Sequence, residues 1–294
     1  MIKKSIFALI ALSLFIASCS SDDDSNASTN SDLTLNLTGL ETLGSDFVYE
    51  GWVIVNDTPV STGVFTSVTF PQTFSVNTEQ LNSATMFVLS IEPLVDPDPA
   101  PSETKVLAGE FNGNSASLGS GPIGDFTNAS GTFFLRTPTD EVPGTANNMN
   151  DFYGVWFGTP GAPPTANLNL PDLSANPGWT YEGWVIGDSG PISTGRFTDF
   201  GGRDDFTDFS GVEFNEGPPV PGEDFFLNAP AGENFPLDIR GRMVVISVEP
   251  VPDDSPAPFV MKPLVAVSGD ETAPATHDFN ANLGSIPGGS VSRN

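Results

Sequence analysis

The sequence predicts an all-β protein of two antiparallel β-sandwich domains in tandem, behind a signal peptide and a disordered tether. A long motif occurs twice, and hydrophobic residues alternate with polar ones over short runs. The chain also contains 30 glycines and 27 prolines, and no segment after the signal peptide shows a 3.6-residue period. Short alternating segments between frequent breakers are typical of antiparallel sandwiches.

The N-terminus predicts export and lipid attachment. Lys3 and Lys4 precede an apolar run that ends at Ala17, too short for a spanning helix and typical of a secretory signal peptide, residues 1–18. The small residues before Cys19 resemble the lipobox of bacterial lipoproteins, which implies cleavage after Ser18 and diacylation of the Cys19 thiol. The alternative is an ordinary signal peptide followed by an unrelated cysteine. Cys19 is the single cysteine, so disulfides and cysteine-based metal sites are excluded.

Residues 19–31 predict a flexible acidic tether, because a run of Ser, Asp, Asn and Thr cannot bury a core. The acidic segment Ser20–Asp24 resembles the export tag of surface-exposed lipoproteins in some Gram-negative bacteria. We therefore expect an outer-membrane lipoprotein at the cell surface; the alternative is a merely solvated linker. The net charge of −27 repels phosphate backbones and anionic lipids, which argues against nucleic-acid binding and leaves the lipid as the membrane contact.

Self-comparison of the sequence identifies two copies of one unit. Three motifs occur twice in the same order: YEGWVI at 49–54 and 181–186, P-hydrophobic-STG-x-FT at 59–66 and 191–198, and S-hydrophobic-EP at 90–93 and 247–250. The first two pairs are 132 residues apart and the third is 157 apart, so the second copy contains an insertion of about 25 residues. The last motif runs into an acidic, proline-rich loop in both copies.

Each copy predicts strands. Residues 47–55 alternate Phe47, Tyr49, Gly51, Val53 and Val55 with a second set that contains Trp52, and a turn at 56–59 indicates a β-hairpin. Residues 87–92 form another alternating run. We expect domains at 32–127 and 128–294, with an insertion at 200–238. The strands expected within 131–158 could instead complete the first domain.

The motif order resembles the extracytoplasmic C-terminal domain of anti-sigma-K factors, twice over. In that family a pair of strands precedes the Trp strand, which favours assigning 131–158 to the second domain. The resemblance implies β-sandwich ectodomains with a sensing or interaction role. Those regulators also carry a cytoplasmic zinc-binding segment and a transmembrane helix, whereas this chain has a lipoprotein signal. We therefore do not expect it to bind a sigma factor directly.

Nothing in the sequence indicates an enzyme. No Gly-x-Ser-x-Gly elbow is present, and His277 is the single histidine, in a polar C-terminal segment that we expect to be exposed. A hydrolase based on two carboxylates remains an alternative. No cofactor is expected, apart from calcium: the loops after the Ser-x-Glu-Pro motifs carry oxygen ligands that suit Ca²⁺, namely Glu92, Asp96 and Asp98 in one copy and Glu249, Asp253 and Asp254 in the other. The alternative is that these acidic loops are simply solvated.

Aromatic residues offer two further candidate sites. Trp52 and Trp184 stand beside Glu50 and Glu182, an arrangement that can bind sugars, although we expect these tryptophans to pack between the sheets, as in immunoglobulin-like sandwiches. The insertion carries phenylalanines that form either an exposed partner-binding patch or a cover for a sheet edge: Phe206, Phe209, Phe214, Phe225 and Phe226. The expected function is therefore non-catalytic sensing or protein interaction at the cell envelope, with calcium or glycan binding as the alternative.

Overall fold

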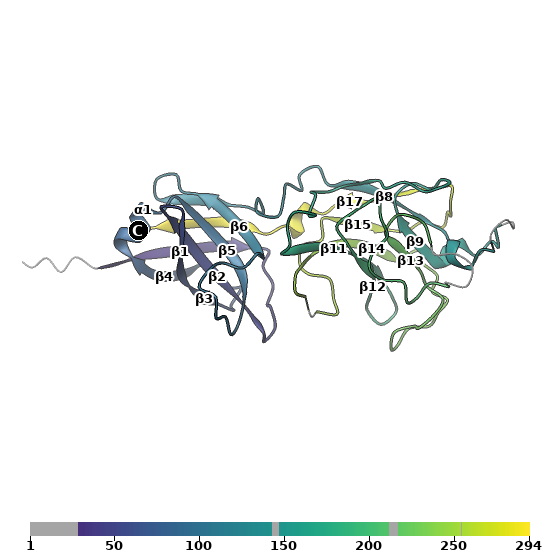
Figure 1. Ribbon diagram of the computed structural model, residues 1–294, viewed down its shortest axis with the longest axis horizontal. Helices are drawn as coiled ribbons and strands as arrows, with labels where there is room; N and C mark the ends of the chain where they lie inside the picture. Colours follow the sequence, from purple (N-terminus) through teal and green to yellow (C-terminus); the bar gives the residue numbers. More distant parts are fainter. Residues whose placement is uncertain (1–28, 143–146, 212–216, 254) are drawn as a thin grey trace, which may run out of the picture.

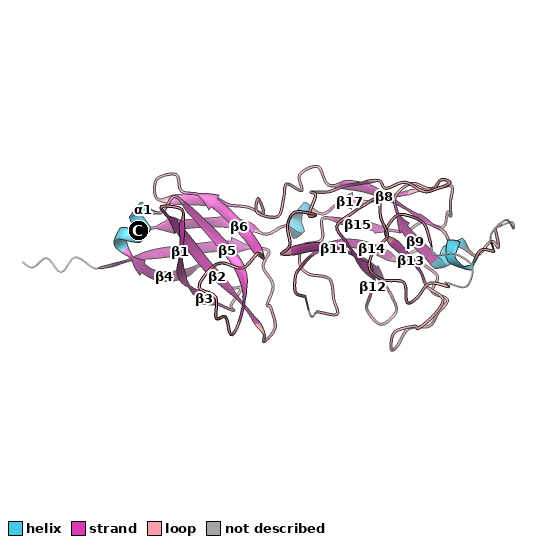
Figure 2. Ribbon diagram, in the orientation of Figure 1, coloured by secondary structure: helices cyan, strands magenta, loops and turns pink. Residues whose placement is uncertain are grey.

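The computed structural model describes residues 29–142, 147–211, 217–253 and 255–294. Nearly all regular structure in this part of the chain is β, in antiparallel sheets, as predicted (Figure 2). Figure 1 shows two bodies side by side: the first half contains β1 to β7 and β18, and the second half contains β8 to β17. Cys19, the whole predicted signal peptide and most of the predicted tether lie outside the described residues. The described end of the tether differs from the prediction, because Asn30 and Ser31 already belong to β1.

The first half consists of two four-stranded sheets, ordered β3-β2-β5-β6 and β4-β1-β18-β7. Their strands are β1 (Asn30–Thr38), β2 (Phe47–Val55), β3 (Thr58–Phe65), β4 (Gln72–Asn77), β5 (Met86–Pro93), β6 (Lys105–Glu110), β7 (Ser115–Leu118) and β18 (Gly288–Arg293). Leu33 and Leu35 of the one sheet and Tyr49 and Phe87 of the other are fully buried in one core cluster. The alternation predicted for β2 is therefore the alternation of its two faces.

The last strand departs from the predicted division of the chain. β18 lies between β1 and β7, with Leu35 opposite Val291 and Ala116 on its other side. The predicted second range, 128–294, includes this strand, and its C-terminal end is corrected accordingly. Val291 is fully buried, so burial of apolar surface in the first half holds the returning strand in place.

The second half contains a five-stranded sheet ordered β12-β11-β14-β15-β17, and a second sheet ordered β10-β8-β9-β13 with β16 paired to β8. The strands are β8 (Ser130–Leu135), β9 (Gly154–Phe157), β10 (Leu168–Asn169), β11 (Trp179–Ile186), β12 (Pro191–Phe197), β13 (Gly222–Asp224), β14 (Met243–Pro250), β15 (Leu264–Val267), β16 (His277–Asp278) and β17 (Asn280–Ala281). The strands within 131–158 thus pair with strands of the second half. His277 is half-buried in β16 and packs on Phe133 at 5.1 Å between ring centroids, which differs from the exposed position expected for it.

The sequence repeat is also a structural repeat. β2, β3 and β5 have the same register as β11, β12 and β14: Gly51 pairs with Gly63, and Gly183 pairs with Gly195. In both copies the next pair is Trp with Ser, so one threonine bulges out of the ladder at the same place. A bulge increases the local twist and redirects side chains, and its position is the same in both copies.

The sequence did not predict the short helix α1 (Thr78–Ser83). Its six residues are too few to show a 3.6-residue period, and the Asn77 side chain caps it by accepting from the Gln80 backbone N–H at 3.1 Å. The three 3-10 turns are η1 (Pro138–Asp140), η2 (Asp151–Tyr153) and η3 (Leu283–Ser285). Over the described residues, no helix has the length and apolar character needed to cross a membrane.

Candidate functional site

The repeated motifs build the same polar network in both halves of the molecule. In the first copy the Trp52 indole N–H donates to the Ser90 hydroxyl at 2.8 Å, and Ser90 donates to the Glu92 carboxylate. In the second copy Trp184 donates to Ser247 at 2.7 Å, and Ser247 donates to Glu249. The strand residues that recur in the sequence are therefore the members of a hydrogen-bond chain.

The two glutamates at the ends of these networks fasten the proline-rich loops to their sheets. Glu92 accepts from the Ser102 backbone N–H at 2.9 Å, and Glu249 accepts from the Phe259 backbone N–H at 2.9 Å. Loss of hydration on burial raises the pKa of both carboxyls, that of Glu249 to about 7, although the serine hydroxyls oppose this. Both side chains are inaccessible to solvent, so their role is structural.

The structure does not assemble the predicted calcium ligands. Among the described residues, no three His, Cys, Asp or Glu side chains are grouped so that they could hold a metal ion. Glu92 and Glu249 are buried in the networks just described, and Asp253 is paired with an arginine. Asp254 lies outside the described residues. The loops use their carboxylates for their own hydrogen bonds: Asp96 accepts from the Asp98 backbone N–H at 2.8 Å.

The two repeated tryptophans are buried, but not between the sheets as expected. Trp52 is 3% exposed and Trp184 is 2% exposed. Their neighbours along the strands, Tyr49 and Tyr181, occupy the core between the sheets, whereas the tryptophans lie on the opposite face. The loop after β5 covers this outer face around Trp52. Because so little of either indole is exposed, the structure does not favour sugar stacking on them.

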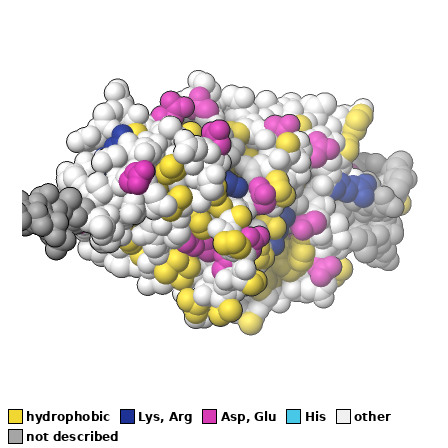
Figure 3. All heavy atoms as spheres, turned by 60° about the vertical axis from the view of Figure 1, so that its left-hand side comes forward, with side chains coloured by type: hydrophobic (Ala, Val, Ile, Leu, Met, Phe, Trp, Pro, Cys, Tyr) yellow, Lys and Arg dark blue, Asp and Glu magenta, His cyan; other side chains and the backbone are white. Residues whose placement is uncertain are grey.

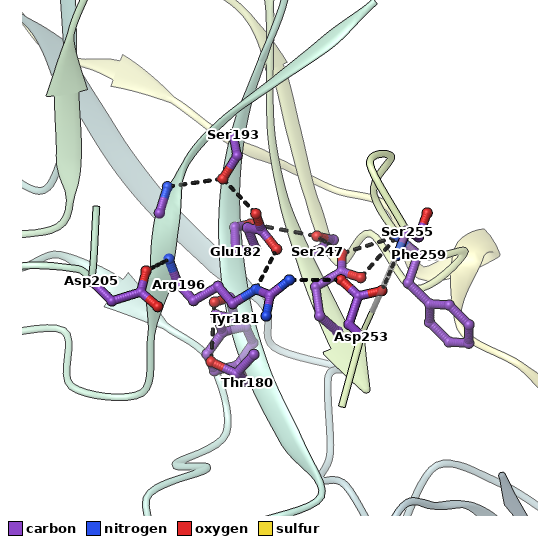
Figure 4. Close-up of polar contacts among 12 residues, drawn as sticks. Thr180, Tyr181, Glu182, Ser193, Arg196, Asp205, Ser247, Asp253, Ser255 and Phe259 are labelled. Atoms are coloured by element: carbon purple, nitrogen blue, oxygen red, sulfur yellow. Dashed lines mark hydrogen bonds and ion pairs between the residues drawn. The ribbon is translucent and has the colours of Figure 1, made fainter. Parts of the chain in front are cut away.

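In the second copy an arginine completes the outer face (Figure 4). The Arg196 guanidinium binds Glu182 Oε2 through Nε at 3.0 Å and Asp253 Oδ2 through a terminal nitrogen at 2.9 Å. Ser193 donates to Glu182 Oε1, and the Ser255 backbone N–H donates to Asp253 Oδ1 at 2.8 Å. Each carboxylate therefore uses one oxygen to fix its own position and the other to bind the guanidinium.

The first copy has the same carboxylates without the arginine. Ser61 donates to Glu50 Oε1, and Asp96 accepts at Oδ1 from Asp98, as the equivalent residues do in the second copy. Val64 replaces Arg196 and is 57% exposed. Within the described residues no lysine or arginine forms a salt bridge with either Glu50 or Asp96.

The result is an open pocket of about 400 Å³ on the outer face of the sheet β3-β2-β5-β6. We call it the open pocket; its lining includes Glu50, Trp52, Val64, Leu94, Asp96 and Pro99. The surface in Figure 3 shows acidic side chains next to hydrophobic ones on one face of the molecule. The open pocket combines the same two properties, because apolar side chains and the carboxylates of Glu50, Asp96 and Asp98 line it.

A second cavity, of about 360 Å³, lies where the two halves meet. Phe47 and Ile91 line it from the first half, and Asp253 and Phe259 line it from the second. Its acid Asp253 already has Arg196 as a partner, at 2.9 Å. Glu41 also lines this cavity, and burial raises the pKa of its carboxyl.

The phenylalanines in the described part of the insertion do not form an exposed patch. Phe209 and Phe225 are buried, and both pack on Phe235 with ring centroids 5.2 Å and 5.7 Å away. Phe206 packs on Phe209 at 4.8 Å, and Phe226 is half-buried near Tyr153. Phe214 lies outside the described residues. The insertion thus extends the core and adds β13 as a strand beside β9. Of the two predicted roles for its phenylalanines, the structure favours the cover of a sheet edge.

The insertion also buries carboxylates that the sequence did not single out. Glu223 and Asp224 are almost completely buried, and removal from water raises the pKa of Glu223 to about 9 and that of Asp224 to about 8. Asp224 accepts from the Thr139 backbone N–H at 2.9 Å and from the Trp156 indole at 3.1 Å. No solvent reaches these groups, so we assign them a structural role. In a chain with 37 acidic residues, no local signal distinguishes them.

Comparisons with models of protein families, with characterised proteins and with solved structures find no match for the chain. The resemblance to anti-sigma-K ectodomains therefore remains a prediction from three short motifs.

Proposed function

We propose that the chain is a non-catalytic lipoprotein of the cell envelope, anchored through Cys19 at the outer membrane, whose two anti-sigma-K-like units serve in sensing or protein interaction. The open pocket is its binding site. The lipid holds the protein outside the cytoplasm, so a direct contact with a sigma factor is not part of the proposal. The partner is another component of the envelope.

The open pocket is the observation that carries the proposal. It joins an apolar lining to the carboxylates of Glu50, Asp96 and Asp98, none of which forms a salt bridge among the described residues. Unpaired charges beside apolar surface are costly to cover unless the covering group supplies the opposite charge. Such a surface selects its partner by charge and by apolar contact.

A photo-crosslinking experiment in living cells tests the binding role. A photoreactive phenylalanine replaces Val64 at the rim of the open pocket or, as a control, Val267 in the second half, which is 62% exposed. We expect irradiation to produce a discrete cross-linked product from position 64 and none from position 267. Equal products from both positions, or none from position 64, would contradict a binding role for this face.

Metabolic labelling tests the anchor separately. Cells that are fed an alkyne fatty acid should label the wild-type protein, and Cys19→Ala should abolish the label. Protease added to intact cells should digest a surface-exposed protein but not a periplasmic one. A wild-type protein without label would contradict the lipoprotein assignment, and protection from the protease would contradict the surface location.

A further inference from the structure

The two copies of the repeat differ at the one position that decides whether the outer face is filled. Position 196 is arginine, and its guanidinium bridges Glu182 and Asp253 at 3.0 Å and 2.9 Å (Figure 4). The equivalent position 64 is valine, whose side chain is too short to reach between the carboxylates and carries no donor. The second copy therefore shows what the first copy lacks.

The carboxylates of the first copy are held as they are in the second. Glu50 Oε1 and Asp96 Oδ1 are occupied by Ser61 and by the Asp98 backbone N–H, which correspond to Ser193 and the Ser255 backbone N–H. The oxygens that bind the guanidinium in the second copy, Oε2 and Oδ2, have counterparts on Glu50 and Asp96 that accept no hydrogen bond from the described part of the chain. One oxygen of each carboxylate is thus already fixed by a hydrogen bond, which lowers the cost of orienting the pair for a guanidinium.

The rest of the lining fits a side chain better than a free ion. Val64 and Leu94, which are 57% and 59% exposed, offer apolar surface against which the methylene stem of an arginine can pack. Calcium requires six to eight oxygens, and the described residues contain no such group. A guanidinium has five donors in a planar fork that can serve two carboxylates at once, whereas an ammonium is a compact point charge. The net charge of −27 also favours a cationic partner.

We propose that the open pocket binds an arginine side chain presented by a partner protein, in the place that Arg196 occupies in the second copy. This inference rests on the proposed binding function and specifies the chemistry of the partner. It adds that the second copy is an internally satisfied form of the same site, closed by its own arginine.

A peptide titration tests the inference. The intact protein, purified in detergent, is titrated by calorimetry with a nine-residue glycine-serine peptide that carries one central arginine. The same peptide with lysine or with uncharged citrulline in the centre provides the comparison. We expect weak binding of the arginine peptide, at least tenfold weaker binding of the lysine peptide, and no heat with citrulline. Equal binding of the arginine and citrulline peptides would overturn the inference.

Two substitutions at equally exposed valines sharpen the test. Val64→Arg gives the first copy its own arginine, so it should abolish peptide binding while the protein stays folded. Val267→Arg adds the same charge in the second half and should leave binding unchanged. If Val64→Arg binds the arginine peptide as well as the wild type does, the open pocket is not the site. Circular dichroism spectra of both variants show whether folding is retained.

A third variant reports on the carboxylates. Glu50→Gln keeps the side chain's shape but removes its charge, and should weaken binding of the arginine peptide at least tenfold. Glu110→Gln, which changes an exposed acid at the end of β6, is the matched control.

The outcomes separate the two proposals. Cross-linking from position 64 without any preference for the arginine peptide would support the binding function and contradict arginine recognition. In the opposite outcome, the arginine peptide binds, Val64→Arg abolishes that binding, and no cross-link forms in cells. This outcome would support arginine recognition by the open pocket and contradict the proposed cellular role.

Discussion

The buried Glu223 makes the stability of the second half depend on pH. Its side chain is 1% exposed, and its Oε1 accepts hydrogen bonds from the Ser210 hydroxyl and from the Asp224 backbone N–H. Burial raises the pKa of the carboxyl from 4.5 to about 9, and the nearby Asp224 and Asp204 add to the rise. The folded protein therefore holds this proton at pH values where the unfolded chain has released it.

The size of the effect follows from proton linkage. A carboxyl that is protonated in the folded state and ionised in the unfolded state lowers the free energy of unfolding by about 1.4 kcal/mol for each unit of pH rise. The stability that this group contributes is complete below pH 4.5 and is lost as the pH rises toward 9. Between pH 5 and pH 8 the loss from Glu223 alone is on the order of 4 kcal/mol.

Glu223→Gln removes this titration, because an amide does not ionise. Urea unfolding at several pH values from 5 to 8, followed by fluorescence, gives the free energy of unfolding of both proteins. We expect the wild-type values to fall more steeply than those of the variant, so that the variant gains relative stability as the pH rises. If the substitution also lowers the free energy of unfolding by the same amount at every pH, the variant's values shift together. The difference in their slope against pH is then unchanged. The exposed-acid variant Glu110→Gln should run parallel to the wild type. Parallel curves for wild type and Glu223→Gln would refute the reasoning.

Three other perturbations test the fold. Trp184→Phe removes the donor to Ser247 and should lower the free energy of unfolding by about 1–3 kcal/mol, with no effect on binding of the arginine peptide; unchanged urea unfolding would contradict a structural role for the network. Phe225→Ala opens a cavity among Phe209 and Phe235 and should cost about 3–5 kcal/mol, whereas an exposed patch residue would cost almost nothing in the same assay. A chain that ends before Gly288 lacks β18, so amide hydrogen exchange should rise in β1 and β7 while β11 stays protected; unchanged exchange in β1 would contradict the pairing.

Local patterns in the sequence predicted the elements that local forces specify. The strands at 47–55 and 58–65 meet at a tight turn in which Asn56 and Asp57 have φ of 49° and 61°, a conformation that these residue types tolerate. The repeat predicted the equivalent strands of the second half. Burial of Trp52 and Trp184 was also predictable, since large aromatic residues within alternating strands are usually covered.

The features that the sequence did not predict depend on contacts between distant segments. Alternation shows that a strand has two faces, but it does not show which face meets the other sheet when a loop covers the outer one. That is the situation of Trp52 beneath the segment that contains Leu94 and Pro99. The burial of Glu223 likewise depends on the hydrogen bond from Ser210 and on the pairing of β13 with β9. No sequence motif links these segments, so the contact could not be predicted.

The candidate site was partly predictable. The acidic loops after β5 and β14 were predicted to supply oxygen ligands, and Asp96 lines the open pocket while Asp253 binds Arg196 in the second copy. The difference between Val64 and Arg196 was visible in the aligned motifs. The effect of this difference on the site depends on how far each carboxylate lies from position 64 or 196, and the sequence does not give these distances.

The position of β18 has a consequence for how the protein matures. A chain that crosses a membrane emerges from its N-terminus, so β1 arrives first and its central partner arrives last; Thr38 and Gly288 are 250 residues apart. Until β18 is present, β7 cannot join the sheet of β4 and β1, because β18 lies between β1 and β7. This sheet can therefore be completed only after the second half has been synthesised, and a molecule interrupted between β8 and β17 leaves the edges of β1 and β7 unpaired.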